Sequence, residues 1–292
     1  MKVEVDVKAA SGFLGCLLFL AACVSQPAEL QARDIRVSGD RIFLPIAVNG
    51  YPVEALLDSG AEMTLVDAAF ASRIGLAAAG NEQIKGTGAG TQDVQLAEGV
   101  EISAAGSVLS DQVVILIDLG EISRRLIGEP LHAVMGRELF DNGRYLLDVD
   151  AGIFRQVRRD AEPGGVMLPL SDANGIKQVP VQINNRGPVA ADFDVGNGNE
   201  ILLSKTFAEK LGLLTEGNVL GTKQGGGVGG QVERTLVRVD TLNLGGVELH
   251  DLVAAVGEAS DGADVNIGLS VLRRFRMVID FPQNKVWLEP LE

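Results

Sequence analysis

Histidine and cysteine are scarce in this chain of 292 residues, which has two of each. The histidines, His132 and His250, lie in unrelated contexts, so neither a zinc site nor a Ser-His-Asp triad can be assembled from them. Both cysteines lie within the first 23 residues, so the remainder has no thiol for a disulfide, a redox centre or a metal ligand. We therefore predict no metal site and no cofactor.

Aromatic residues are also few, at 4%, whereas glycine is abundant, with 36 residues. This mixture is typical of tight turns and aliphatic strands rather than of helical bundles. Basic residues are outnumbered, 25 against 39 acidic ones, which gives a formal net charge of −14. Because an acidic chain is repelled by phosphate groups, we exclude nucleic acid and anionic lipid as electrostatic partners.

The N-terminal segment holds the apolar run GFLGCLLFLAAC, which has the length of a signal-peptide core and is short for a membrane span. Its end, Leu20-Ala21-Ala22-Cys23, resembles the lipobox of bacterial lipoproteins. The resemblance implies a signal peptide over 1–22, lipidation of Cys23, and anchoring in the cell envelope at the periplasmic face of the outer membrane. An ordinary signal peptide or an uncleaved anchor stays open. The polar residues 23–39 are predicted to form a flexible tether.

Two blocks of sequence occur twice in the same order. Residues 44–76 and 179–213 each contain two strands around an Asn-containing turn, an Asp-x-Gly sequence and a short helix before Gly-Leu. Residues 133–157 and 265–290 form the second matching pair. Such recurrence indicates a tandem duplication of one β-rich unit. The predicted boundaries are 40–157 for the first unit, 158–174 for a linker and 175–292 for the second unit.

Each unit also carries a glycine-rich turn, IKGTGAGTQDVQL in the first and KQGGGVGGQVERTLV in the second. A phosphate-binding loop requires a following helix or a Gly-Lys-Ser/Thr sequence. Here an alternating, strand-like sequence follows instead. We interpret both turns as the tips of hairpins, with Gly86, Gly88, Gly90, Gly226 and Gly227 at or near the tips.

The Asp-x-Gly sequences place one carboxylate, Asp58 or Asp194, after an apolar strand in each unit. A lone aspartate in a turn usually caps its own backbone, but a twofold arrangement of two units would bring these loops together. Adjacent carboxylates share a proton because both cannot easily ionise. Such a pair can activate water against a carbonyl group, and Gly60 and Gly196 would allow the tight turns that this requires.

The sequences Leu57-Asp58-Ser59-Gly60-Ala61 and Phe193-Asp194-Val195-Gly196 resemble those of the retropepsin-like aspartic proteases, in the bacterial single-chain form with two units. The blocks ending at Gly136 and Gly268 resemble the apolar-apolar-Gly motif of that family. The resemblance covers 40–290. It implies a mainly β fold of two closed β units about a pseudo-twofold axis, and peptide hydrolysis by Asp58 and Asp194. The two glycine hairpins would be flaps over a peptide or protein substrate.

The second unit departs from the family pattern at Val195, where the family has Thr or Ser, and at Asn197. The hydroxyl of Ser59 can bond to the opposing loop, whereas Val195 has no hydroxyl. We therefore expect the pair to be supported unequally by Ser59, Gly60, Val195 and Gly196. An active endopeptidase is favoured. Three alternatives stay open: an inactive relative that binds peptides in the same cleft, an enzyme formed by the first units of two chains, and a structural envelope lipoprotein.

Two further features are predicted to be structural. Asp148 and Asp280 each lie 12 residues after the glycine of the motif, in an alternating strand. The pair Arg124-Arg125 is predicted to lie on a solvated face.

Overall fold

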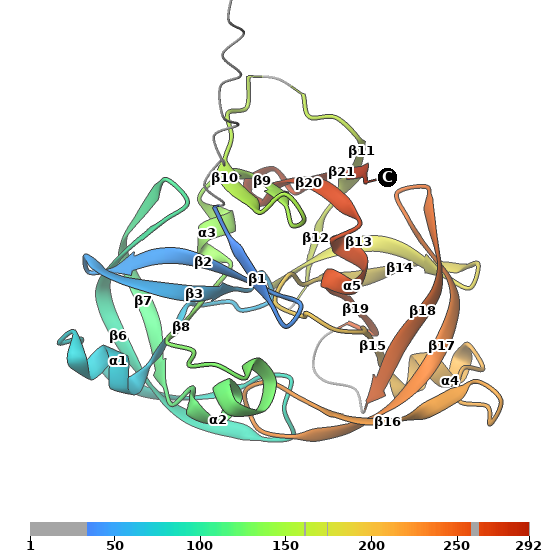
Figure 1. The fold of residues 1–292 in the computed structure, drawn as a ribbon, viewed down its shortest axis with the longest axis horizontal. Coiled ribbons are helices and arrows are strands. Elements are labelled where there is room, and N and C mark those ends of the chain that lie inside the picture. The colour runs from blue at the N-terminus through green and yellow to red at the C-terminus, as the bar shows by residue number, and fades with distance from the viewer. Residues whose placement is uncertain (1–33, 161, 174, 258–262, 292) are drawn as a thin grey trace, which may run out of the picture. The chain divides into compact units, whose positions relative to one another are not determined.

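The computed structural model describes residues 34–160, 162–173, 175–257 and 263–291. Residues 33–292 form one compact body, which is mainly β and contains three sheets (Figure 1). No helix in the described ranges is long and apolar enough to cross a membrane. The predicted signal peptide and Cys23 lie outside the described residues, so lipidation stays a prediction.

The first unit is built on an eight-stranded sheet in the order β1-β2-β3-β8-β4-β7-β6-β5, and β2 also pairs with β6. The turn between β2 and β3 is formed by Asn49 and Gly50, whose φ angles of 47° and 78° suit a tight hairpin. The strands of this sheet are β1 (Arg36–Ser38), β2 (Arg41–Val48), β3 (Tyr51–Leu57), β4 (Leu65–Asp67), β5 (Gly80–Lys85), β6 (Thr91–Ala104), β7 (Ser107–Ile117) and β8 (Ala133–Met135).

The second unit has a sheet of the same design, in the order β12-β13-β14-β19-β15-β18-β17-β16. Equivalent hydrogen bonds hold both aspartates: Asp58 N donates to Met135 O at 3.0 Å, and Asp194 N donates to Ile267 O at 3.1 Å. The predicted duplication is therefore confirmed. The strands are β12 (Ser171–Ala173), β13 (Ile176–Ile183), β14 (Arg186–Phe193), β15 (Ile201–Ser204), β16 (Val219–Gly225), β17 (Val232–Leu244), β18 (Val247–Gly257) and β19 (Val265–Ile267).

A five-stranded sheet, in the order β10-β9-β20-β21-β11, joins the two units because β9 of the first pairs antiparallel with β20 of the second. Figure 1 shows it along the upper edge of the body. Its strands are β9 (Arg144–Asp148), β10 (Ile153–Gln156), β11 (Val166–Pro169), β20 (Phe275–Asp280) and β21 (Lys285–Pro290).

Parts of the predicted tether and linker are ordered strands. β1 lies within 23–39 and pairs with β2, while β11 and β12 lie within 158–174 and pair with β21 and β13. β1 and β12 are polar in sequence and β11 is apolar, and each is ordered by backbone hydrogen bonding to a neighbouring edge. The unit boundaries themselves stay predictions.

The helices are short and lie at strand ends. Asp67 caps α1 and Ser204 caps α4, each by accepting backbone N–H groups of the first turn. Gly75 and Gly212, at φ of 74° and 70°, follow the ends of the same two helices. The helices are α1 (Ala68–Arg73), α2 (Gly120–Ile122), α3 (Glu138–Asp141), α4 (Lys205–Lys210) and α5 (Leu269–Leu272), with a π-helix η1 (Ser123–Ile127) and a 3₁₀-helix η2 (Phe281–Gln283).

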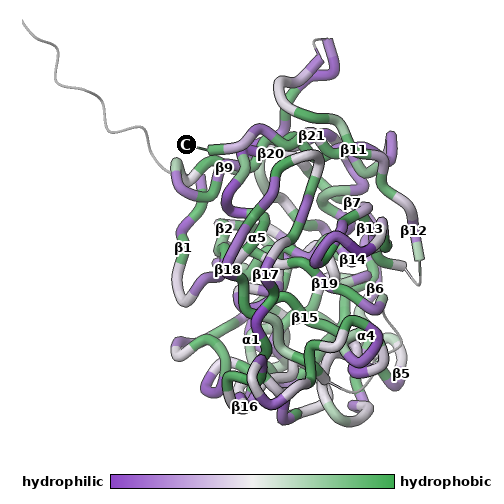
Figure 2. Tube along the Cα trace, turned by 90° about the vertical axis from the view of Figure 1, so that its right-hand side faces the viewer, coloured by the Kyte–Doolittle hydropathy of each residue, from purple (hydrophilic) through white to green (hydrophobic). Residues whose placement is uncertain are grey.

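The main hydrophobic core is continuous from one unit to the other. Aromatic rings gather beneath the joining sheet, where Phe140 lies 5.2 Å from Phe281 and Tyr145 lies 5.2 Å from Phe154, measured between ring centroids. Figure 2, which views the second unit, shows hydrophobic residues along β15 and β19, with hydrophilic residues at turns and along the outer hairpin of β17 and β18. The two units thus share one interior.

Two buried aspartates join the units through arginines of the other half. Asp280, which has no exposed surface, accepts from Arg144 Nε at 2.9 Å and Arg159 Nη2 at 2.7 Å. Asp148 accepts from Arg276 Nε at 3.1 Å. Burial acts to raise the pKa of Asp280, but the hydrogen bonds and charges of Arg159 and Arg144 outweigh it and lower that pKa. The structure agrees with the structural roles predicted for both aspartates.

We expect Asp280→Asn to lower the free energy of unfolding at pH 7 by roughly 3–5 kcal/mol, because it removes one partner of a buried ion pair. Since the pKa of Asp280 is lower in the folded state, its contribution is present above the unfolded pKa of about 3.9 and is lost as the pH falls below that value. Denaturant unfolding of both proteins at pH 7 and pH 3 measures this. The exposed Asp160→Asn is the control, and an equal difference at both pH values would contradict the assignment.

Candidate active site

Asp58 and Asp194 each follow the last residue of a strand, β3 and β14 respectively. In both loops, Oδ1 of the aspartate accepts the backbone N–H groups two and three positions further along the chain. The distances are 2.8 and 3.1 Å for Asp58, and 2.9 and 3.1 Å for Asp194. This bonding fixes each short side chain relative to its own loop, so the backbone sets the direction of both carboxylates.

The two loops face each other across the boundary between the units. A Cβ atom placed on Gly196 would lie 2.2 Å from Cγ of Asp58, and one on Gly60 would lie 3.0 Å from Cγ of Asp194. Each glycine therefore leaves room for the carboxylate of the opposite unit. The charge of Asp194 acts on the Asp58 carboxyl group, and the structure brings together within one chain the two aspartates that the sequence predicted as a pair.

The electrostatics of the pair favour one shared proton. Burial, followed by the negative charge of Asp194, raises the pKa of Asp58 to about 8. The backbone N–H groups of Gly60 and Ala61 oppose this rise but do not cancel it. At neutral pH the pair therefore holds a proton on the Asp58 side. In the part of the chain that the structure describes, no cluster of three or more His, Cys, Asp or Glu side chains is arranged to hold a metal ion.

A side-chain amide makes the pair unequal. Asn266 Nδ2 donates to Oδ2 of Asp194 at 2.8 Å, and Asn197 Nδ2 donates to Oδ1 of Asn266 at 2.9 Å. Through this chain of amides, Asp194 has a side-chain donor among its partners. Val134 occupies the equivalent position in β8 and has no donor.

Sequence reasoning did not assign a role to Asn266. The residue was read as part of a motif that is otherwise apolar-apolar-Gly, and Asn197 was noted only as a departure from the family pattern. A polar residue within that motif was the available signal. Two such departures in one unit point to a mutual contact.

The hydroxyl of Ser59 links the two loops. Ser59 is 1% exposed. Its Oγ donates to Phe193 O at 2.8 Å and accepts the N–H of Val195 at 3.1 Å. Val195 is fully buried and has no hydroxyl group, so it cannot form the equivalent hydrogen bonds to the first loop. The support of the pair is therefore one-sided, in agreement with the sequence prediction.

Two glycine-rich hairpins meet each other, one between β5 and β6 and the other between β16 and β17 (Figure 1). Gly88 N donates to Val228 O, and Gly90 N donates to Gly229 O, both at 2.9 Å. A Cβ atom on Gly88 would lie 2.3 Å from the carbonyl carbon of Gly229, so only glycine permits this approach. The structure places all five predicted flap glycines, Gly86, Gly88, Gly90, Gly226 and Gly227, in these two turns.

Arg125 of η1 fastens the second hairpin to the first unit. Its Nη1 donates to the carbonyl oxygens of Gly225 at 3.2 Å and Gly226 at 2.6 Å, and its Nη2 donates to Gly227 O at 3.2 Å. Glu121 forms an ion pair with the same guanidinium group. The side chain of Arg125 is 11% exposed, so the predicted solvated face is wrong for this residue. Its partners lie about 100 residues away, where no local charge pattern reveals them.

We expect Arg125→Ala to free the second hairpin, because it removes three hydrogen bonds from a charged donor, each contributing about 1.5–3 kcal/mol. Amide hydrogen exchange of residues 225–230 is expected to quicken at least ~10-fold, with unchanged protection of β9 and β20. The exposed neighbour Arg124→Ala provides the control and is expected to leave exchange unaltered. Unchanged protection in Arg125→Ala would show that the hairpin is held by other contacts.

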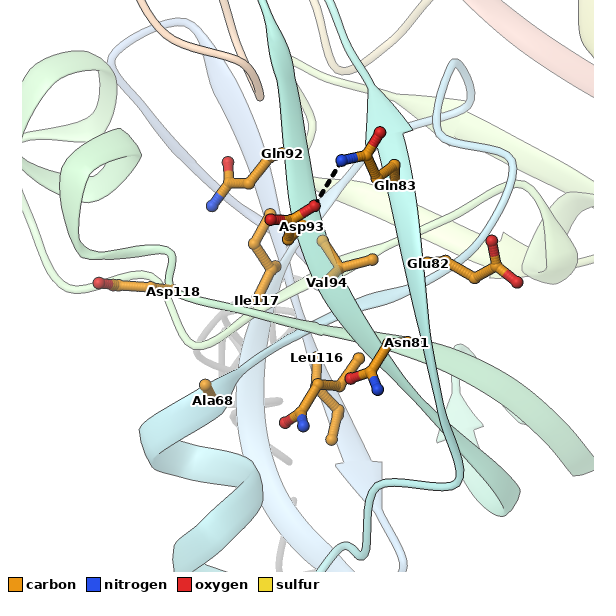
Figure 3. A pocket seen from close by; sticks show the side chains of 11 residues that line it. Ala68, Asn81, Glu82, Gln83, Gln92, Asp93, Val94, Leu116, Ile117 and Asp118 are labelled. Carbon is orange, nitrogen blue, oxygen red and sulfur yellow. Dashed lines mark hydrogen bonds between the residues drawn. The ribbon is translucent and has the colours of Figure 1, made fainter.

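Two hollows lie beside these hairpins. One, of about 820 Å³, is bounded by α1, β5, β6 and the end of β7, and Gln83 Nε2 donates to Asp93 Oδ1 at 2.7 Å in its wall (Figure 3). The other, of about 310 Å³, lies between the second hairpin and the segment around α2. Neither is lined by Asp58 or Asp194, so the larger hollow is distinct from the candidate site.

Comparison with known protein families gives two matches to one family model, described as aspartyl protease, over residues 44–131 and 179–271. One match falls on each unit, and each includes one of the paired aspartates. No curated protein sequence matches the chain.

Proposed function

Because this chain belongs to the aspartyl protease family, with one match in each unit, we propose that it is an aspartic endopeptidase with Asp58 and Asp194 as its catalytic pair. The observation that carries the proposal is the close approach of the two loops, in which Gly60 and Gly196 each leave room for the carboxyl group of the opposite unit.

The unequal surroundings of the two carboxyl groups assign their roles. Asp194, charged and supported by Asn266, takes a proton from a water molecule as the water oxygen attacks the carbonyl carbon of the peptide. Asp58 donates its proton to the carbonyl oxygen, and a tetrahedral gem-diol forms. The proton on Asp194 then passes to the amide nitrogen, Asp58 takes back a proton from the gem-diol, the C–N bond breaks, and a carboxylic acid and an amine leave. No bond to the protein is formed at any step.

We expect Asp58→Asn and Asp194→Asn each to lower the rate of peptide hydrolysis by at least ~10²-fold, because acid–base exchange needs both carboxyl groups. The substrate for this measurement is an unfolded protein or a peptide library, and the proteins lack residues 1–23. Both variants should keep the fold, since the amide has the shape of the acid. The exposed Asp240→Asn serves as the control.

The pH profile adds a second criterion to the same experiment. Above a pH of about 8 the proton on Asp58 is lost, so hydrolysis by the wild type should fall as the pH rises through that value. Full activity of Asp194→Asn with an inactive Asp58→Asn would instead support pairing of the first units of two chains.

An inactive, peptide-binding relative is the second candidate, and the absence of a hydroxyl at Val195 is the observation that favours it. Binding of peptides by the wild type, without hydrolysis at any pH from 3 to 8, would select this alternative. Since the loop around Asp194 keeps both of its backbone hydrogen bonds, we favour the active enzyme.

Anchoring through a lipid on Cys23 remains our proposal for location, on the basis of the sequence Leu20-Ala21-Ala22-Cys23. Cys23→Ser is expected to leave the protein soluble or unprocessed when cells are separated into membrane and soluble fractions. Normal processing and membrane attachment of Cys23→Ser would contradict lipidation.

A further inference from the structure

The duplication allows the two walls beside the catalytic pair to be compared residue by residue. Leu56 lies two positions before Asp58, and Asp192 lies two positions before Asp194. Leu56 is therefore the counterpart of Asp192. Asn266, the cross-strand partner of Asp192, donates to Asp194 at 2.8 Å, so Asp192 lies beside the catalytic pair.

The neighbouring strands extend this comparison. In the first unit, Leu56 is opposite Phe43 on β2 and Val134 on β8. In the second, Asp192 is opposite Gln178 on β13 and Asn266 on β19. Three apolar positions of the first unit thus correspond to three polar positions of the second.

The wall of the first unit is continuous apolar surface. Phe43, Leu56 and Val134 are 2%, 5% and 8% exposed and belong to one hydrophobic cluster. Val228, at the tip of the second hairpin, packs against this cluster.

The wall of the second unit is polar although it is equally buried. Asp192 is 4% exposed, and its carboxylate accepts from Gln178 Nε2 at 2.9 Å and from the backbone N–H of Ala263 at 3.3 Å. A carboxylate has about four acceptor positions, so these bonds leave acceptor capacity that an apolar neighbour cannot use. Burial raises the pKa of Asp192, with a further contribution from Asp194.

The charges near this wall favour a hydrogen-bond-donating side chain of a peptide over an acidic one. Asp194 acts electrostatically on Asp192. Arg41, which interacts with both catalytic aspartates, is itself desolvated, and burial lowers its pKa. An acidic side chain placed against Asp192 and Asp194 would be repelled.

We propose that the surroundings of Asp58 and Asp194 are two-faced, taking an apolar side chain against Leu56 and Val134 and a hydrogen-bond-donating side chain, an amide or a cation, against Asp192 and Gln178. The two side chains flank the bond that is cleaved. This specificity rests on the proposed function, because it assumes that a peptide lies across Asp58 and Asp194.

The test measures binding, so that it does not depend on hydrolysis. Fluorescence anisotropy with the Asp58→Asn protein compares labelled peptides that differ only at two central residues: Leu-Leu, Leu-Gln, Leu-Lys and Leu-Glu, each in both orders. In the better order, the Gln and Lys peptides should bind at least ~10-fold more tightly than the Leu-Leu peptide, and the Glu peptide more weakly than the Gln peptide. Tightest binding of Leu-Leu, or no binding of any peptide, would overturn the proposal.

The first unit provides the matched variant. The double variant Gln178→Phe/Asp192→Leu is made in the Asp58→Asn protein. It reproduces the Phe43–Leu56 pair that this fold already accommodates. We expect it to shift the binding preference to the Leu-Leu peptide by at least ~10-fold. Asp192→Asn keeps hydrogen-bonding capacity and should retain the preference for Gln, and exposed Glu216→Leu is the control. An unchanged preference in the double variant would overturn the proposal. If the double variant does not fold, the comparison of Asp192→Asn with the Asp58→Asn protein tests the proposal instead. Absence of hydrolysis by the wild type counts against the proposed function alone.

Discussion

The buried hydroxyl of Ser59 sets the position of one aspartate loop relative to the other, and the geometry of the carboxyl pair depends on it. By bonding to Phe193 O and Val195 N, it holds the residues on either side of Asp194. Each bond contributes about 1 kcal/mol. Their larger effect is geometric, because β3 and β14 end here and a small shift would separate two side chains that must share a proton. Gly60 and Gly196 then allow the carboxylates to approach.

Features that depend on short spacing could be predicted from the sequence. The duplication, the paired aspartates, the one-sided role of Ser59 and the glycine hairpins follow from repeated motifs, and a repeat implies equivalent surroundings. Contacts between distant segments could not be predicted in the same way. Arg125 resembles any exposed arginine until its three carbonyl partners are known, and β11 resembles a linker until its pairing with β21 is seen. Asn266 was visible as a departure from its motif, but its partner was not.

The two units are alike in their backbone and different in their side chains. Backbone N–H groups hold both aspartates in the same way, because these bonds depend on the loop conformation and not on residue type. The side chains around the two aspartates differ, so we propose different roles for the two carboxyl groups. Val134 of the first unit has no donor, whereas Asn266 of the second donates to Asp194, so the two carboxyl groups have different surroundings. A symmetric scaffold thereby supports an asymmetric reaction.

The joining sheet has a consequence for how the chain reaches its native state. Since β9 and β10 come from the first half and β20, β21 and β11 from the remainder, neither half can complete this sheet by itself. Pairing of β9 with β20 brings together residues more than 100 positions apart, and such contacts form late because closing a long loop costs entropy. A half-molecule would also expose the edge of β9 as a template for other strands. The duplicated halves are therefore one cooperative folding unit, although each carries a complete sheet of its own.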